Sequence, residues 1–387
     1  MTLCLKNCRF IVTQDANRSI LENQDILIEG NQIKQIGKNL SAVREIDCSQ
    51  QIIMPGLINL HTHAGMFFLR GLSDDLPYLQ WWEDVIWPTE KTMTMKDKKK
   101  GAEASIKEMI QTGTTCFLDM YEGSEDVADL VKQYGIRASI AYGMIDINDK
   151  EKSKIEWDRT EKFKNYLKKL NCSRVKLAVG PNTSFTCSEE TLIRSQKYAQ
   201  ENNALVHIHI SEAKRDDFPI DLLGDNVVAA HCCYLSEEDI KIFSEKKVSI
   251  AHCPRSNMKL ASGVMPLKKY MDAGICVGLG TDSSVSNNNL DMFEEMQTAA
   301  LLQKVHFKSA TAATAQQILD LATINGAKAL KLSAGSIEQG KLADIVLLDA
   351  NHSLIQPLKK DRIVSHLVYS VNGSCVQKVI VDGKIIC

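Results

Sequence analysis

Eight short apolar runs alternate with helical stretches along most of the 387-residue chain. Strands that are buried on both faces read as continuous apolar runs, and their alternation with helices is typical of βα units in a parallel sheet. Eight units in succession predict a closed (β/α)8 barrel, and the absence of a glycine-rich dinucleotide fingerprint after the first run disfavours an open doubly wound sheet. The expected strands are 57–61, 114–120, 136–144, 174–180, 204–210, 226–232, 248–253 and 275–282.

The two ends of the chain predict a second, smaller unit. Residues 1–54 carry alternating strand patterns with a turn at Gly30-Asn31, and residues 335–387 return to strand character after a long helical region. Gly-Asn between alternating segments is typical of a hairpin. We therefore expect a small β-sandwich domain built from both termini, beside a barrel of residues 55–334.

Chemically active side chains gather where the predicted strands end. The carboxyl ends of barrel strands form the active site in (β/α)8 enzymes. The first strand ends in His61-Thr62-His63, and alternation along a strand turns both imidazoles to one face. Other strands contribute a further set, and catalytic metal sites need three or more protein ligands plus water, so this convergence predicts a metal centre. The further set is His207, His209, Glu212, His231, His252 and Asp282.

The residues alone suggest a role for some of these side chains. His209 lies nearer the rim and is the better ligand, whereas His207 is more typical of a packed interior histidine. Asp282, at the rim of the last strand, is placed to be a fourth ligand and to take a proton from bound water. Glu212 lies past its strand and could sit over the open position, although a simple loop acid is the alternative. His252 either lines the pocket or is structural.

Composition disfavours several classes of partner. The net charge is −2, and we find no dense Lys/Arg patch with interleaved aromatic residues, so neither nucleic acid nor an anionic membrane is an expected partner. Twelve cysteines without a CxxC pair indicate reduced thiols. Together with an N-terminus that lacks a signal-peptide pattern and the lack of an apolar stretch that could span a bilayer, they predict a cytoplasmic protein.

An ordered set of motifs resembles the metal-dependent amidohydrolases, and within them the 5′-methylthioadenosine/S-adenosylhomocysteine deaminases with their 5′-deoxyadenosine-type members. The motifs are PGLINLHTH, LRGLSDDLPYLQWWEDVIWPTE, HIHISE, AHC, SNMKLASG and GTDSSVSNNNLDMFEEM. Two-metal relatives carry a bridging lysine at the end of the fourth strand, where this chain has Gly180-Pro181-Asn182. The resemblance thus implies one zinc ion (Zn²⁺), or iron, per subunit, held by His61, His63, His209 and Asp282.

The resemblance also implies the reaction. An adenosine-type nucleoside would lose ammonia at C6 and become the inosine analogue, because a metal lowers the pKa of bound water from about 15.7 to about 7. Glu212 would protonate N1, while Asp282 and His231 take a proton from the water. Glu90 would hold the ribose hydroxyls and Trp81 would form the wall near the 5′ group. A homo-oligomer is implied by analogy alone.

Three departures from the family pattern qualify the expected substrate and fold. Asn182 stands where a histidine usually contacts the purine. Tyr142 stands where members that act on S-adenosylhomocysteine carry an arginine, and a tyrosine cannot form that bidentate ion pair, so we expect an uncharged 5′ group. The connection from Glu212 to His231 and the C-terminal tail are short, which predicts a stunted barrel helix and no final surface helix.

Other functions remain open at this level. An amidohydrolase that acts on guanine, a pterin or a triazine is the nearest alternative; Asn182 favours it, and Glu90 and Trp81 oppose it. A non-catalytic scaffold would show gaps in the ligand set, and we find none. A redox enzyme that uses a nucleotide cofactor lacks its phosphate-binding glycine loop.

Overall fold

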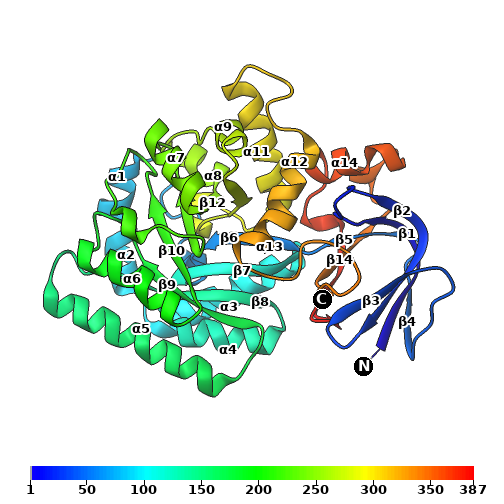
Figure 1. Cartoon of the computed structure of the whole chain (residues 1–387), viewed down its shortest axis with the longest axis horizontal. Helices are drawn as coiled ribbons and strands as arrows, with labels where there is room; N and C mark the ends of the chain where they lie inside the picture. The colour runs from blue at the N-terminus through cyan, green and yellow to red at the C-terminus, as the bar shows by residue number, and fades with distance from the viewer. Residues whose placement is uncertain (1) are drawn as a thin grey trace.

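A parallel sheet of eight strands organises the computed structural model, which describes residues 2–387 (Figure 1). Each strand pairs with its neighbour in sequence, in the order β13-β12-β11-β10-β9-β8-β7-β6. This arrangement confirms the predicted barrel. The strands are β6 (Leu57–Thr62), β7 (Thr114–Tyr121), β8 (Arg137–Met144), β9 (Val175–Pro181), β10 (Leu205–Ile210), β11 (Val227–His231), β12 (Ser249–His252) and β13 (Cys276–Leu279).

Side-chain hydrogen bonds close the barrel between its first and last strands. The fully buried Asn59 donates from Nδ2 to Thr281 Oγ1 over 2.7 Å, and its Oδ1 accepts from the backbone N–H groups of Thr281 and His61. Glycine permits this close approach, because a Cβ at Gly280 would lie 2.7 Å from His61 Cβ. One amide side chain on β6, two residues before His61, therefore makes two of the hydrogen bonds across this seam.

Helices cover the outside of the barrel. The connection between β10 and β11 is the exception, because its only helical part within the described chain is the 3-10 turn Ile220–Leu222, which confirms the predicted stunted helix. The last element of the described chain is the strand β16 (Lys384–Ile385). The helices are α3 (Met95–Gln111), α4 (Ser124–Tyr134), α5 (Lys150–Leu170), α6 (Glu189–Glu201), α7 (Glu237–Lys246), α8 (Pro254–Lys259), α9 (Leu267–Asp272), α10 (Ser284–Asn287), α11 (Met292–His306), α12 (Ala315–Asp320) and α13 (Gly326–Ala329).

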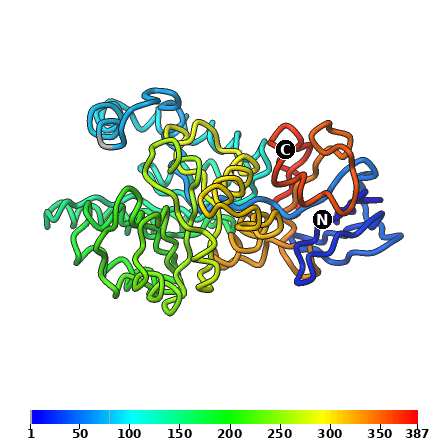
Figure 2. The backbone as a smooth tube through the Cα atoms, turned by 90° about the horizontal axis from the view of Figure 1, so that it is seen from above, coloured from blue at the N-terminus to red at the C-terminus, as the bar shows by residue number. Residues whose placement is uncertain are grey.

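A mixed sheet from both chain ends lies beside the barrel (Figures 1 and 2). β5 pairs with β1 from the N-terminal part and with β14 from the C-terminal part, and the predicted hairpin joins β2 to β3. The division into domains 1–54 plus 335–387 and 55–334 stays a prediction. The strands are β1 (Thr2–Val12), β2 (Ile20–Glu29), β3 (Gln32–Gly37), β4 (Arg44–Asp47), β5 (Gln51–Pro55), β14 (Ile345–Asp349), β15 (Val376–Val381) and β16 (Lys384–Ile385).

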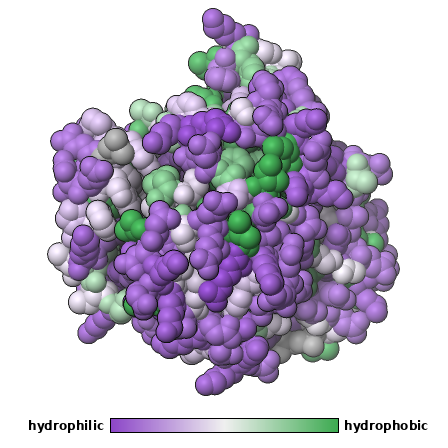
Figure 3. Space-filling model, turned by 60° about the vertical axis from the view of Figure 1, so that its left-hand side comes forward, coloured by the Kyte–Doolittle hydropathy of each residue, from purple (hydrophilic) through white to green (hydrophobic). Residues whose placement is uncertain are grey.

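One face of the molecular surface is mainly hydrophilic (Figure 3). Figure 3 shows one face, on which apolar side chains gather only in small groups among polar ones. Among the helices of residues 2–387, none has the length and apolar character needed to cross a membrane.

Candidate active site

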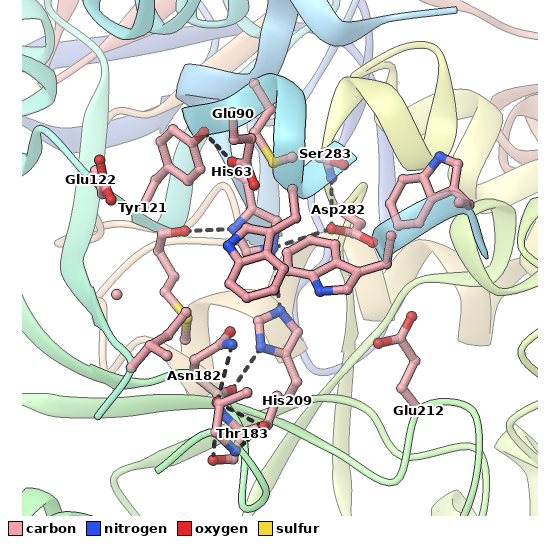
Figure 4. A pocket seen from close by; sticks show the side chains of 18 of the residues that line it. His63, Glu90, Tyr121, Glu122, Asn182, Thr183, His209, Glu212, Asp282 and Ser283 are labelled. Atoms are coloured by element: carbon pink, nitrogen blue, oxygen red, sulfur yellow. Dashed lines mark hydrogen bonds and ion pairs between the residues drawn. The ribbon is translucent and has the colours of Figure 1, made fainter. Parts of the chain in front are cut away.

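A cavity of about 620 Å³ opens at the carboxyl ends of the barrel strands. Most of the predicted site residues line it, although they come from six different parts of the chain. His61 lies behind the lining, because its side chain is fully buried. The predicted residues on the cavity wall are His63, Trp81, Glu90, Asn182, His209, Glu212, His231 and Asp282, and Figure 4 shows several of them.

Three imidazoles and one carboxylate meet at the base of this cavity. The Nε2 atoms of His61 and His63 each lie 3.4 Å from Asp282 Oδ1. The Nε2 atom of His209 lies 3.2 Å from that of His63. Ligand atoms about 2.0–2.1 Å from a tetrahedral zinc ion lie roughly 3.3 Å from one another, so these separations match a shared cation.

The protons on these rings point away from the shared point. His63 Nδ1 donates to the carbonyl oxygen of Met120, and His209 Nδ1 donates to that of Asn182 over 2.8 Å. A carbonyl oxygen can only accept, so each neutral ring carries its proton on Nδ1 and a lone pair on Nε2. His61 Nε2 is buried and has no hydrogen-bond partner. Lone pairs that face one another in such a site repel, and a cation placed among them would remove that repulsion, so the residues fit a divalent metal.

Burial and neighbouring groups give His61, His209 and Asp282 the charge states of metal ligands. Burial lowers the pKa of His61 and His209, so both rings are neutral. For Asp282, burial opposes ionisation, but the adjacent imidazoles of His61, His63 and His231 outweigh it and lower the pKa. Ser256 Oγ donates to Asp282 Oδ2 over 2.6 Å, and the backbone N–H of Ser283 donates to Oδ1 over 2.7 Å, which fixes the carboxylate.

An acid and a base lie beside the cluster. Glu212 Oε2 is 3.8 Å from His231 Nε2 and accepts a hydrogen bond from the hydroxyl of Tyr78 over 3.2 Å. Burial raises the pKa of Glu212, so this carboxyl holds a proton more readily than an exposed glutamate. Asn257 Nδ2 donates to His231 Nδ1 over 3.0 Å, which turns His231 Nε2 toward Glu212.

The outer part of the cavity holds the predicted substrate contacts. Glu90 accepts a hydrogen bond from the hydroxyl of Tyr121, and burial raises the pKa of Glu90. The indole of Trp81 is buried, and its Nε1 has no hydrogen-bond partner. Asn182 donates from Nδ2 to Thr186 Oγ1 over 3.2 Å while its backbone carbonyl holds His209.

Tyr142 does not reach this cavity, so its predicted contact with the 5′ group is wrong. Along β8 the side chains alternate, and Tyr142 points outward into the helix layer, whereas the next residue, Gly143, lines the cavity. The hydroxyl of Tyr142 accepts a hydrogen bond from Arg159 Nη1 on α5. Both residues line a separate, smaller hollow together with Lys162.

Sequence reasoning missed three side chains that hold the predicted ones in place. Tyr121, at the end of β7, could have been found from the strand-end rule. Tyr78 and Asn257 lie outside the strands, and only the folded chain brings them to Glu212 and His231. Tyr78 belongs to the stretch between β6 and α3, which includes a π-helical segment (Trp81–Ile86) and stands out from the body in light blue in Figure 2.

The sequence of this chain is similar to those of known proteins along almost its whole length. Residues 52–386 match a profile of the amidohydrolase family. A 5-methylthioadenosine/S-adenosylhomocysteine deaminase of Thermococcus kodakarensis is 43% identical over 405 residues, covering 100% of this chain and 94% of the relative. A 5′-deoxyadenosine deaminase of Methanocaldococcus jannaschii is 43% identical over 385 residues, covering 94% and 91%.

Solved structures share the same architecture. An adenosine deaminase from Xanthomonas campestris with bound zinc superimposes with a TM-score of 0.92 at 30% identity, covering 99% of this chain and 92% of that one. An atrazine chlorohydrolase from Arthrobacter aurescens complexed with zinc gives a TM-score of 0.88 at 22% identity, covering 99% and 94%, and this likeness concerns the fold alone.

Proposed function

This chain belongs to the amidohydrolase family, and we propose that it deaminates adenosine-type nucleosides hydrolytically, to the inosine analogue and ammonia. The substrates are 5′-deoxyadenosine, 5′-methylthioadenosine and adenosine. The observation that carries the proposal is the meeting of three imidazoles with the carboxylate of Asp282, beside the half-buried acid Glu212 and in the same cavity as Glu90. The full-length similarity to proteins named as deaminases of such nucleosides supports the substrate class.

The cofactor in this proposal is a single divalent metal ion, zinc, and the same ligands would accept iron. His61, His63, His209 and Asp282 would hold it, since imidazole and carboxylate are typical zinc ligands in catalytic sites that keep a position open for water. When bound, such an ion lowers the pKa of water to about 7 and so supplies hydroxide at neutral pH. β9 ends in Gly180-Pro181 and Asn182 follows, with no lysine there that could bridge a second ion, which supports one ion per subunit.

Proton transfer is assigned to residues whose positions and charge states suit it. Glu212 gives a proton to N1 of the adenine ring, which makes C6 electrophilic, and its burial favours the protonated form this step needs. Asp282 takes a proton from the attacking water and passes it to the departing amine, and His231, whose Nδ1 accepts from Asn257, polarises that water through its Nε2–H. Water thus adds at C6, the C6–N bond breaks, and ammonia leaves. General acid–base help of this kind contributes roughly 10²–10⁴-fold.

Glu90 is proposed to bind the ribose. The Tyr121 hydroxyl satisfies one carboxylate oxygen of Glu90, which leaves the other for the two ribose hydroxyls. Trp81 would form the wall near the 5′ substituent, and Asn182 would offer its side-chain amide to the purine in place of the usual histidine. A free base has no ribose for Glu90 to hold.

An uncharged 5′ group suits the cavity better than the charged tail of S-adenosylhomocysteine. Tyr142 no longer supports this inference, but Lys98 on the cavity wall does. Its ammonium is paired with Glu122, so Lys98 cannot pair with a substrate carboxylate without giving up that partner.

Ammonia release by the zinc-loaded protein tests the proposed substrate class. The assay compares 5′-deoxyadenosine, 5′-methylthioadenosine, adenosine, S-adenosylhomocysteine, guanine and cytosine. We expect turnover of the first three, with a lower kcat/KM for S-adenosylhomocysteine. Turnover of a free base without turnover of any adenosine derivative would contradict the proposal and favour the amidohydrolases that act on guanine, pterins or triazines.

We further propose that the enzyme works in the cytoplasm as a homo-oligomer. The twelve cysteines are all free thiols, most of them buried, which suits a reducing compartment.

Family analogy supports the oligomer. Light scattering coupled to size-exclusion chromatography tests it, and a mass equal to one 43.1 kDa chain would contradict it.

A further inference from the structure

His207 lies on the same face of its strand as the ligand candidate His209, but it does not line the cavity. It is on β10, two residues before His209, and its side chain is fully buried. Its Nε2 lies 2.7 Å from His61 Nδ1, and its Nδ1 lies 2.9 Å from the carbonyl oxygen of Val228 on β11. Both ring nitrogens of His207 therefore have a partner, one of which is a ligand candidate.

The hydrogen bonds from His61 through His207 to Val228 fix where the protons lie on the two rings. The Val228 carbonyl can only accept, so the proton of His207 is on Nδ1 and its Nε2 carries a lone pair. That lone pair accepts the proton on His61 Nδ1. His61 Nε2, which is buried and faces Asp282, must then be unprotonated.

His61 differs in this respect from the other two imidazoles. His63 and His209 donate from Nδ1 to the backbone carbonyl oxygens of Met120 and Asn182. His61 has an imidazole in that place. A carbonyl oxygen can accept only, whereas an imidazole nitrogen could equally be a donor, so the tautomer of His61 depends on the bond between His207 and Val228.

We propose that His207 is a positioning residue of the metal centre, which holds the proton of His61 on Nδ1 and leaves the Nε2 lone pair for the ion. This inference rests on the proposed function only in requiring that the cluster bind a metal, and it is independent of the substrate. A packed interior histidine, the alternative, would affect stability without affecting the tautomer of His61.

Two substitutions separate these readings. His207→Leu removes the acceptor for His61, whereas His207→Gln offers a carbonyl oxygen to His61 and an amide to Val228. His252→Leu is the matched control, because His252 is also fully buried at a strand end, and neither of its ring nitrogens has a hydrogen-bond partner. All three variants lose one buried imidazole.

The first readout is the affinity for Zn²⁺, measured by competition with a chromogenic chelator. Loss of an outer partner of a ligating histidine typically weakens metal binding about 10–100-fold. We expect that loss for His207→Leu, recovery to within about threefold for His207→Gln, and no comparable change for His252→Leu. Equal affinities for His207→Leu and the wild-type protein, or equal losses in the Leu and Gln variants, would overturn the proposal.

The second readout needs no variant to fold. Long-range ¹H–¹⁵N spectra of the metal-free wild-type protein, labelled at histidine, report which nitrogen of each ring is protonated. We expect His61 in the Nδ1–H form, and an Nε2–H form would overturn the proposal. If His207→Leu weakens metal binding but adenosine derivatives are not turned over, the substrate assignment fails and the role of His207 stands. If the wild-type protein binds no metal, both proposals fail.

Discussion

The backbone N–H of Asp282 donates to the carbonyl oxygen of His61 over 2.9 Å, and the side chains of the same two residues lie 3.4 Å apart across the candidate metal site. These residues are 221 positions apart in the sequence: His61 is on the first barrel strand, β6, and Asp282 follows the last one, β13. The same pair of residues therefore closes the barrel and brings metal-ligand candidates together. A change at the seam should affect stability and metal binding together.

Asn59→Ala tests this coupling. The substitution leaves the buried N–H groups of Thr281 and His61 without their acceptor, and each buried donor left unpaired costs about 1–3 kcal/mol. We expect the free energy of unfolding in urea to fall by about 2–4 kcal/mol and the affinity for Zn²⁺ to fall with it. Thr281→Val removes the hydroxyl bonds to Asn59 and to the carbonyl oxygen of Asp282 but keeps the acceptor of both N–H groups, so it should lose less, about 1 kcal/mol. Equal losses in both variants would show that Asn59 does not hold the seam.

Glu212→Gln tests the assignment of the proton donor. The amide cannot supply the proton that N1 requires, so kcat should fall about 10²–10⁴-fold while the bound zinc stays at the wild-type amount. Glu83→Gln, a second acid on the cavity wall, is the control and should keep near wild-type turnover. Near-normal rates in the Glu212 variant would remove this residue from the mechanism.

Tyr121→Phe tests ribose binding by Glu90. Without the Tyr121 hydroxyl, Glu90 loses the partner that orients its carboxylate, and a hydrogen bond to a charged group contributes about 1.5–3 kcal/mol. We expect KM for adenosine to rise by about tenfold or more, with little change for 2′,3′-dideoxyadenosine, which lacks both hydroxyls. Tyr134→Phe is matched to it, because Tyr134 bonds to Glu103 in the same way far from the cavity. Equal effects on the two nucleosides would contradict the role given to Glu90.

Glu295 should make stability depend on pH. This fully buried carboxyl lies behind the Asp282 loop, where burial raises its pKa from 4.5 to about 8. The folded protein then holds the proton more tightly than the unfolded chain, so the contribution of Glu295 to stability is full below pH 4.5 and is lost as pH rises to about 8. Glu295→Gln should thus gain stability relative to wild type over that interval in urea unfolding at pH 5 to 9. A constant difference would contradict the raised pKa.

Much of the barrel was predictable because its strands are buried on both faces and therefore read as unbroken apolar runs. The rim residues were predictable for a related reason. Each apolar run concerned gives way to a polar side chain at its carboxyl end, and these side chains include His61, His63, His209 and Asp282. The short connection before His231 could be read from its length, and the 3-10 turn Ile220–Leu222 that fills it confirms that reading.

Other features depend on side-chain direction or on contacts distant in sequence. Tyr142 was misplaced because its position near a strand end does not say which face of β8 it occupies, and the structure turns it outward. Tyr78 reaches Glu212 across 134 positions from a segment without regular periodicity. The pairing of His207 with His61 depends on the tilt of two rings on strands β10 and β6, which no local pattern encodes.

Titration of the metal-free protein with Zn²⁺ tests the central claim most directly. Ammonia release from 5′-deoxyadenosine is followed as a function of added metal, with bound metal counted by elemental analysis, in the wild-type protein and in His63→Ala. Turnover should appear in proportion to bound zinc and saturate at one ion per chain, and the variant should neither hold the ion nor turn over. Full activity of the metal-free protein, or saturation only at two ions per chain, would contradict a single ion held by His61, His63, His209 and Asp282.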